Sequence, residues 1–254
     1  AVNSKELTYV PSTPFAPGEQ VTVSLLSSIM NSSQSTALDT TETFQFRTQP
    51  AVGPSDFPVD SVITSSVATP FDAVPADFNG DGHMDVVTAS WNDGVLWFEN
   101  GGNGQSWTQN QIATFEGAPD RVWVADLNGT GRMDVLVGGD TSVVWHENQM
   151  GTAEEDGDGF SGAVTITTSV SSVRGMYVGD LDGDGDADVA TASENDNMIA
   201  WHENTAGDGS NWATYSLTTS LDGAVSVEGA DLDGDNDLDL LASASFGTDR
   251  AFWF

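Results

Sequence analysis

A nine-residue acidic loop occurs four times along this chain. The copies read DFNGDGHMD from Asp77, DLNGTGRMD from Asp126, DLDGDGDAD from Asp180 and DLDGDNDLD from Asp231. In each copy, side chains that carry oxygen atoms alternate around glycines, and a short apolar stretch follows. Oxygen ligands on a tight curl are typical of loops that bind calcium. We therefore expect cation-binding loops that each lead into a strand.

The spacing of the loops predicts the fold. They begin 49, 54 and 51 residues apart, at positions 77, 126, 180 and 231. A short apolar strand is expected after each loop, as in DVVTAS from Asp85, and an aromatic strand follows it, as in VLWFEN ending at Asn100. A polar alternating strand and a strand before the loop complete the unit. Four strands per repeat of this length predict an all-β fold, a β-propeller of four-stranded blades with very little helix.

The number of blades is open on the sequence alone. Residues 59–65, VDSVITS, match the outermost strand of a blade, whereas the fourth repeat stops at Phe254 without one. The first strand could therefore close a small four-bladed disc, or the four blades could belong to a larger ring. We favour the larger ring, because an exposed hydrophobic edge strand would reduce solubility.

The first 50 residues predict a separate module without an acidic loop. Alternating segments with Pro and Gly punctuation give three strands, about half of an immunoglobulin-type sandwich. We expect a partial Ig-like β-sandwich over residues 1–50, a stiff linker over residues 51–58 and blades over residues 59–254. Asn31, in the sequon NSS, is a glycosylation candidate if the source glycosylates its proteins.

The composition excludes several classes of partner and site. The net charge is -33 and only 6 Lys and Arg are present, which argues against nucleic acid and anionic membranes. With 38% hydrophobic residues, 8 Trp and 12 Phe, the chain can still build cores. There is no cysteine for a disulfide, a zinc finger or a thiol nucleophile, and no apolar run approaches a membrane span of about 20 residues. These features favour an extracellular, calcium-rich setting without membrane insertion of this segment.

The ligand set follows from the preference of calcium for six to eight oxygens. Side chains at loop positions 1, 3, 5 and 9 and the backbone carbonyl at position 7 can supply them. An EF-hand would require Glu at position 12, where this chain has Thr88, Val137, Thr191 and Ala242. The candidate metal ligands are therefore Asp77, Asn79, Asp81, His83 and Asp85; Asp126, Asn128, Thr130, Arg132 and Asp134; Asp180, Asp182, Asp184, Asp186 and Asp188; and Asp231, Asp233, Asp235, Asp237 and Asp239.

The second loop differs from the others in its charge. Thr130 replaces the aspartate at position 5, so that this loop has two carboxylates where the others have three or more. We expect it to bind calcium most weakly, and we expect three or four calcium ions in total.

No residues predict catalysis. His146 and His202 recur in the phrase WHEN, but the equivalent positions hold Phe98 and Phe254, which indicates packing. No serine-histidine-acid phrase, phosphate loop or HExxH motif is present, although scattered carboxylates could meet in space. We expect no catalytic residue, no enzyme activity and no cofactor besides calcium. The recurring Trp97, Trp145, Trp201 and Trp253 are interpreted as core between blades.

On the D-x-D-G-D-G-x-x-D core, repeated at blade spacing, residues 59–254 resemble the FG-GAP/VCBS repeat family. The resemblance implies a β-propeller, typically seven-bladed, with calcium in hairpin loops and a role in adhesion or scaffolding. The first 50 residues are similar to the C-terminal half of a bacterial-type Ig-like domain, on PFAPGEQVTVSL and FQFRT.

We therefore expect a calcium-binding structural or adhesive module of a large secreted or cell-surface protein. Its partners would be extracellular proteins, matrix or glycans, and other modules of the same chain. The alternatives are a carbohydrate-binding propeller, either a lectin or a polysaccharide lyase, and a subunit of an extracellular filament.

Overall fold

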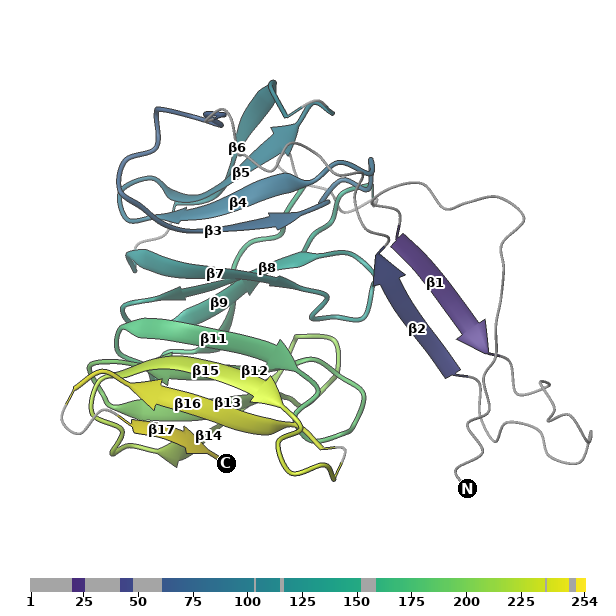
Figure 1. Cartoon of the computed structure of the whole chain (residues 1–254). Helices are drawn as coiled ribbons and strands as arrows, with labels where there is room; N and C mark the ends of the chain where they lie inside the picture. The colour runs from purple at the N-terminus through teal and green to yellow at the C-terminus, as the bar shows by residue number, and fades with distance from the viewer. Residues whose placement is uncertain are drawn as a thin grey trace, which may run out of the picture. The chain divides into compact units, whose positions relative to one another are not determined.

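A computed structural model describes residues 20–25, 42–47, 61–102, 104–114, 117–151, 159–235, 237–246 and 250–254. The chain divides into two compact units, residues 1–60 and residues 61–254. The described elements are all strands (Figure 1). No helix with the length and apolarity of a membrane span occurs in this described part.

In the first unit, β1 (Gln20–Leu25) pairs antiparallel with β2 (Glu42–Arg47). Gln20 lies opposite Arg47 and Leu25 opposite Glu42. This sheet contains two of the three strands expected before residue 50. One sheet does not make a sandwich, which needs two packed sheets, so the Ig-like interpretation is not established. Asn31 and the expected linker 51–58 lie outside the described residues.

The second unit contains four antiparallel sheets, which we call blades 1 to 4 in chain order (Figure 1). Three blades have four strands and blade 4 has three described strands. Blade 1 consists of β3 (Pro70–Ala76), β4 (Asp85–Ser90), β5 (Gly94–Asn100) and β6 (Trp107–Ala113); blade 2 of β7 (Pro119–Ala125), β8 (Asp134–Gly139), β9 (Val143–His146) and β10 (Val164–Thr167); blade 3 of β11 (Val173–Gly179), β12 (Asp188–Ser193), β13 (Met198–Asn204) and β14 (Trp212–Thr218); and blade 4 of β15 (Ala224–Ala230), β16 (Asp239–Ala244) and β17 (Arg250–Trp253).

The fold is therefore all-β, with repeated antiparallel sheets that match propeller-like blades. One expected strand is missing: residues 61–69, which include most of the VDSVITS segment, form no strand. Alternation of apolar and polar residues also suits extended chain without a strand partner, which is why the sequence pattern misled here.

The middle strands are buried on both faces because each inner blade lies between two others. Every residue of β8 (DVLVGG) and of β12 (DVATAS) is buried. The outer strand β14 is largely exposed, in line with its polar alternation. Runs without polar alternation thus identify strands that are covered on both sides.

Three hydrophobic clusters join successive blades. Val87 and Trp97 of blade 1 pack with Val135 of blade 2, and Leu136 and Trp145 of blade 2 belong to the next cluster, which extends to blade 3. The third cluster joins blades 3 and 4. Among the described residues, no such cluster joins blade 4 to blade 1, so the blades form an open series.

Blade 4 exposes the face that its predecessors bury. Leu241 occupies the register position of Val87 and Leu136, yet it is 42% exposed, and Trp253 is 56% exposed. Trp97 and Trp145 at the equivalent position are buried in clusters between blades. The expectation that all four recurring tryptophans form such core therefore fails at Trp253, because no described sheet covers it. It also fails at Trp201, which is half-buried, stacks on Tyr215 and belongs to none of the three clusters.

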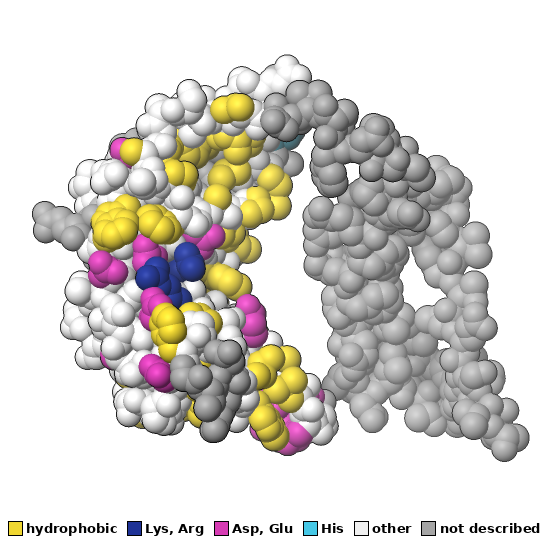
Figure 2. Space-filling view, turned by 60° about the vertical axis from the view of Figure 1, so that its left-hand side comes forward, with side chains coloured by type: hydrophobic (Ala, Val, Ile, Leu, Met, Phe, Trp, Pro, Cys, Tyr) yellow, Lys and Arg dark blue, Asp and Glu magenta, His cyan; other side chains and the backbone are white. Residues whose placement is uncertain are grey.

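The strands that precede the acidic loops, β3, β7, β11 and β15, are the inner strands of their blades. Contacts run from β3 to β7, from β7 to β11 and from β11 to β15. Arg121 in β7 donates a hydrogen bond from Nε to the backbone oxygen of Arg174 in β11 at 2.8 Å. Figure 2 shows a face on which Lys and Arg side chains gather among Asp and Glu side chains.

Candidate metal centre

The acidic loops occupy the same hairpin in every blade. Loop 1 (residues 77–85) joins β3 to β4, loop 2 (126–134) joins β7 to β8, loop 3 (180–188) joins β11 to β12, and loop 4 (231–239) joins β15 to β16. Each last residue begins the second strand of its blade. The register of the sheets therefore places the four loops at equivalent points of the fold.

The first aspartate of each loop holds the curl together. In loop 3, Asp180 accepts hydrogen bonds from the backbone N–H groups of Gly183 at 2.8 Å and Gly185 at 3.1 Å. These glycines have φ values of 78° and 98°, which side chains with a Cβ rarely adopt. The D-x-x-G-x-G spacing thus forms the turn through its own hydrogen bonds.

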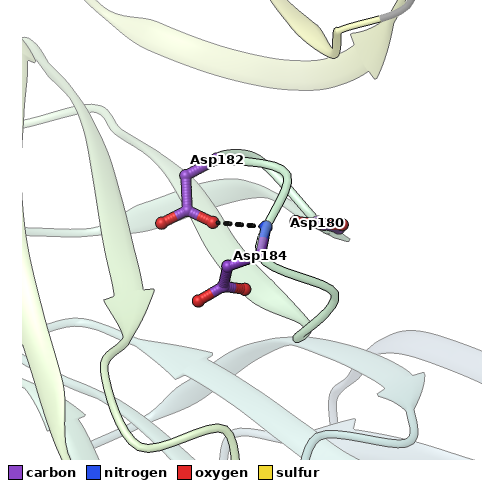
Figure 3. A group of neighbouring side chains, drawn as sticks. All are labelled: Asp180, Asp182 and Asp184. Carbon is purple, nitrogen blue, oxygen red and sulfur yellow. Dashed lines mark hydrogen bonds between the residues drawn. The ribbon is translucent and has the colours of Figure 1, made fainter.

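Two loops gather three carboxylates. Asp180, Asp182 and Asp184 are exposed and bring one oxygen each within 4.8 Å of one another. Figure 3 shows the carboxylates of Asp182 and Asp184 on the same side of the loop, where Asp182 accepts a hydrogen bond from the backbone of Asp184 at 3.2 Å. A second triad consists of Asp231, Asp233 and Asp239.

The triads fit a hard divalent cation. Two ligands at calcium–oxygen distances of about 2.4 Å can be no more than about 5 Å apart, and both triads satisfy that limit. Their like charges also oppose one another. The pKa of Asp182 is raised by desolvation first, and then by the negative charges of Asp184, Glu203 and Asp180. A bound cation would relieve this repulsion.

Loop 1 has the same curl with a different donor set. Asp77 accepts hydrogen bonds from the N–H groups of Gly80, Asp81 and Gly82. Asn79 accepts one from Asp81 at 3.0 Å. Three acids do not converge in this described loop, because position 3 is Asn79 where loop 3 has Asp182.

Loop 2 has only two carboxylates, the half-buried Asp126 and the buried Asp134. Asp126 accepts hydrogen bonds from Thr130 at 3.0 Å and Gly131 at 2.7 Å, as the curl requires. The side chain of Arg132 turns away, donating from Nε to the backbone oxygen of Asn148 at 2.6 Å. The guanidinium also lies 4.0 Å from Glu147. The loop keeps its shape but offers less charge to an ion.

The aspartate at position 9 has a second role that was not expected. Asp85, Asp134 and Asp188 are buried, and each accepts two backbone N–H bonds, one from position 2 of its own loop and one from the end of the aromatic strand. Burial raises all three pKa values, and that of Asp134 to about 7. A carboxylate has further lone pairs for a metal, so ligation and this hydrogen bonding are compatible. Asp239 is only half-buried and joins the second triad.

Side chains at position 7 lie against the following turns. A Cβ on Gly102 would approach His83 Nε2 to 2.9 Å, and one on Gly207 would meet Asp186 Oδ2. Asp235 accepts a hydrogen bond from the backbone of Asp237 at 3.0 Å. These side chains lie outside the triads, in keeping with a role for the backbone carbonyl at position 7.

Two residues of the phrase W-x-E-N contact the loops, and sequence reasoning missed both. Glu99 accepts a hydrogen bond from Asn79 at 3.2 Å, and Glu147 accepts one from Asn128 at 3.0 Å. The asparagines at the end of the phrase donate from their backbone N–H groups to the position-9 aspartates. The recurrence of Glu-Asn in three copies was the available signal.

The two histidines of the phrase WHEN are buried. His202 lies 3.0 Å from Thr191 Oγ1 through Nε2 and 3.0 Å from Thr214 Oγ1 through Nδ1. Burial lowers its pKa to about 4. The interpretation of this position as packing agrees with that placement.

Comparisons with known proteins identify the family of these repeats. The profile of the FG-GAP-like repeat matches residues 77–137, 126–191 and 180–242. No curated protein sequence matches the chain.

Several solved structures are similar in part. An Agrocybe aegerita lectin that recognises non-reducing terminal N-acetylglucosamine has 20% identity and a TM-score of 0.48 over 72% of this chain. BBS1N in complex with ARL6DN has 10% identity and a TM-score of 0.49 over 74%. The V. cholerae biofilm matrix protein Bap1 has 15% identity and a TM-score of 0.38 over 74%. The matched region spans 52%, 54% and 37% of those chains.

The repeat matches together run from residue 77 to residue 242 and include all four acidic loops. They cover more than half of the chain, which therefore belongs to the FG-GAP-like repeat family.

Proposed function

We propose that the blades form a calcium-binding structural or adhesive module of a large secreted or cell-surface protein. The observation that carries the proposal is the pair of aspartate triads in equivalent hairpins of blades 3 and 4, exposed except for the half-buried Asp239. Calcium at these loops neutralises crowded carboxylates and fixes the hairpins at one edge of each blade. The blades then present a rigid surface to an extracellular protein or matrix partner.

Calcium fills the loops unequally in this proposal. Loops 3 and 4 have the triads and bind most tightly, loop 1 follows with Asp77, Asn79 and Asp81, and loop 2 is weakest. The total is three or four ions. A site filled at 100 times its Kd stabilises the fold by about 2.7 kcal/mol.

The test is calorimetric titration of the chelator-treated chain with calcium, beside thermal melts with and without calcium. We expect at least two tight sites and a marked rise in Tm. Magnesium should bind more weakly, since it demands octahedral geometry and dehydrates reluctantly. Absence of binding heat together with an unchanged Tm would contradict the proposal.

Further modules of the same protein are the proposed neighbours of the blades. The exposed Leu241 and Trp253 support this, because a following blade would bury them as blades 2 and 3 bury Val87 and Leu136. The partial Ig-like module and the larger ring belong to the same proposal. The scarcity of Lys and Arg argues against nucleic acid as a partner.

Carbohydrate binding is a second candidate, favoured by an exposed aromatic pair. Phe71 and Trp91 are both exposed, with ring centroids 5.7 Å apart. Sugars stack on such faces. A glycan array with the wild-type chain and Trp91→Ala would test this, with Trp107→Ala as a control that removes an indole elsewhere in the same blade. Equal signals from the wild type and both variants would exclude the Phe71–Trp91 surface.

A further inference from the structure

The side chain of Asn148 crosses from blade 2 to blade 1. Its Nδ2 donates to the backbone oxygen of Phe78 in loop 1 at 2.9 Å, and also to Met133 of its own blade at 3.1 Å. Its backbone N–H donates to Asp134 Oδ1 at 2.8 Å. One residue thus holds the second position of loop 1 and the last position of loop 2.

Asn204 repeats the arrangement one blade further on. Its Nδ2 donates to the backbone oxygen of Leu127 in loop 2 at 3.0 Å, and its N–H donates to Asp188 Oδ1 at 2.8 Å. The N–H groups of Phe78 and Leu127 donate in turn to Asp85 at 3.3 Å and Asp134 at 3.0 Å.

These bonds form one continuous chain across three blades. Starting in loop 1, the order is Asp85, Phe78, Asn148, Asp134, Leu127, Asn204 and Asp188. All seven residues are buried. Water therefore cannot easily replace any hydrogen bond in this series. A change at one buried carboxylate alters the hydrogen-bond partners of the next carboxylate in the series.

The neighbouring bonds fix the orientation of both amides. Asn148 Oδ1 accepts the N–H of Met150 at 3.0 Å, and Asn204 Oδ1 accepts the N–H of Gly209 at 3.0 Å. Each Nδ2 must then face the carbonyl of the preceding blade, because a reversed amide would place two donors or two acceptors together.

The equivalent residue of blade 1 behaves differently. Asn100 donates from Nδ2 to Met84 in its own blade at 3.0 Å and accepts from Gly102 and Gly104. Within the described residues it has no hydrogen bond to another blade. Loop 4 likewise has no asparagine bonded to Asp239 in the described part of blade 4, so the chain of bonds links loops 1, 2 and 3.

We propose that Asn148 and Asn204 are positioning residues that couple the metal-binding loops of successive blades. Occupancy of one loop fixes its position-9 aspartate, which fixes the asparagine and thereby the carbonyl at position 2 of the preceding loop. Such coupling is reciprocal, so each loop also affects the next one. Loop 2, the poorest in charge, acts as the connection between loops 1 and 3. The inference rests on the calcium binding proposed above.

The test isolates loop 1 in the full chain. A background with Asp126→Asn, Asp180→Asn and Asp231→Asn removes the first ligand from the other three loops, and a second background that keeps Asp126 leaves loop 2 able to bind. Loop 1 should bind calcium more tightly in the second background, and this difference should vanish with Asn148→Ala; equal binding at loop 1 in the two backgrounds would overturn the coupling. Calcium titrations in the first background also compare Asn148→Ala with Asn204→Ala, the same substitution at the equivalent buried site one blade away. Asn148 contacts loop 1 and Asn204 does not. Both substitutions leave a cavity and a backbone carbonyl without its hydrogen-bond donor.

We expect Asn148→Ala to weaken calcium binding at loop 1 roughly fivefold, the lower end of typical couplings, and Asn204→Ala to leave it within about twofold. Hydrogen exchange with chelator present should quicken over residues 77–85 in the first variant only. Asn148→Leu, close in size, replaces the alanine variant if that variant is too unstable to titrate.

Equal effects of the two variants, or none from either, would overturn the coupling while wild-type binding upheld the proposed function. A wild-type chain that takes up no calcium would overturn both. Binding by the wild type but none by the background with three altered loops would remove loop 1 as a metal site, and with it the coupling at Asn148.

Discussion

Arg174 in β11 donates from Nη1 to Oδ2 of Asp120 in β7 at 2.7 Å, which joins blade 3 to blade 2. Its Nε donates to Glu194 at 2.7 Å. Asp120 is almost fully buried, and its pKa is raised by desolvation in spite of the guanidinium, which lowers it. The pair is therefore a polar connection between two inner strands beside the hydrophobic clusters.

Removing the positive charge of Arg174 should destabilise the blades. Arg174→Met leaves the Asp120 carboxylate buried without its partner, and we expect a loss of about 2 kcal/mol, below the range for fully buried pairs because Arg174 is partly exposed. Urea denaturation measures it. Glu194→Gln keeps an acceptor for Arg174 and should cost less; an equal or smaller loss in Arg174→Met would contradict the role of this pair.

The role of the loop 3 triad in calcium binding can be tested by removing one of its charges. Asp184→Asn removes one of three clustered carboxylates and should weaken calcium binding at that loop at least about tenfold, since each hard ligand counts in such a site. The control is Asp208→Asn, which removes an exposed charge just outside the loops. If both variants bind alike in calorimetry, net charge rather than the triad governs affinity.

Loop 2 can be given the missing ligand. Thr130→Asp restores the carboxylate found at position 5 in the other three loops. Because the curl through Asp126 is already formed, we expect a gain of about one calcium ion per chain and a higher Tm in calcium. Without calcium the same change should lower Tm slightly through repulsion. An unchanged stoichiometry of four ions would mean that loop 2 binds calcium already in the wild type, and an unchanged stoichiometry of three would show that Arg132 or the buried Asp134 prevents binding.

His202 predicts a loss of stability in acid. Its folded-state pKa of about 4 lies below the ordinary value of 6.5, so the unfolded chain takes up the proton first as the pH falls. The neutral ring stabilises the fold fully above pH 6.5, and that stability declines between pH 6.5 and 4, by roughly 3 kcal/mol in all. His202→Phe, the residue type at Phe98, should flatten this part of the curve, although Thr191 and Thr214 lose a partner. Denaturation at a series of pH values checks it; an equally steep decline in the variant would assign the effect to other groups.

Replacing two equivalent leucines with alanine should destabilise the fold by different amounts. Leu136 is fully buried between blades 2 and 3, whereas Leu241 on blade 4 is 42% exposed. We expect Leu136→Ala to cost about 3 kcal/mol and Leu241→Ala less than about 1 kcal/mol in urea denaturation. Similar costs would mean that another surface covers Leu241 in solution, and sedimentation would then show an assembly of more than one chain.

Sequence reasoning reached the blades because their determinants are local. The Asp and Gly spacing of each loop sets its own curl, and the apolar runs around Val87 and Val135 give the strands. Asn148 could not be predicted, since its acceptor Phe78 lies 70 residues earlier, in another blade. The double role of Asp134 was hidden for a different reason: the same carboxylate suits a metal ligand and an acceptor of two N–H bonds, and only burial distinguishes them.

The link made by Asn148 and Asn204 has a consequence for how such a chain can grow. Blade 2 contains both halves of the joint, the amide of Asn148 that reaches backward and the carbonyl of Leu127 that receives the following repeat. Duplication of a single stretch of gene would copy a working connector together with the blade, and new repeats could be added without any change in the old ones.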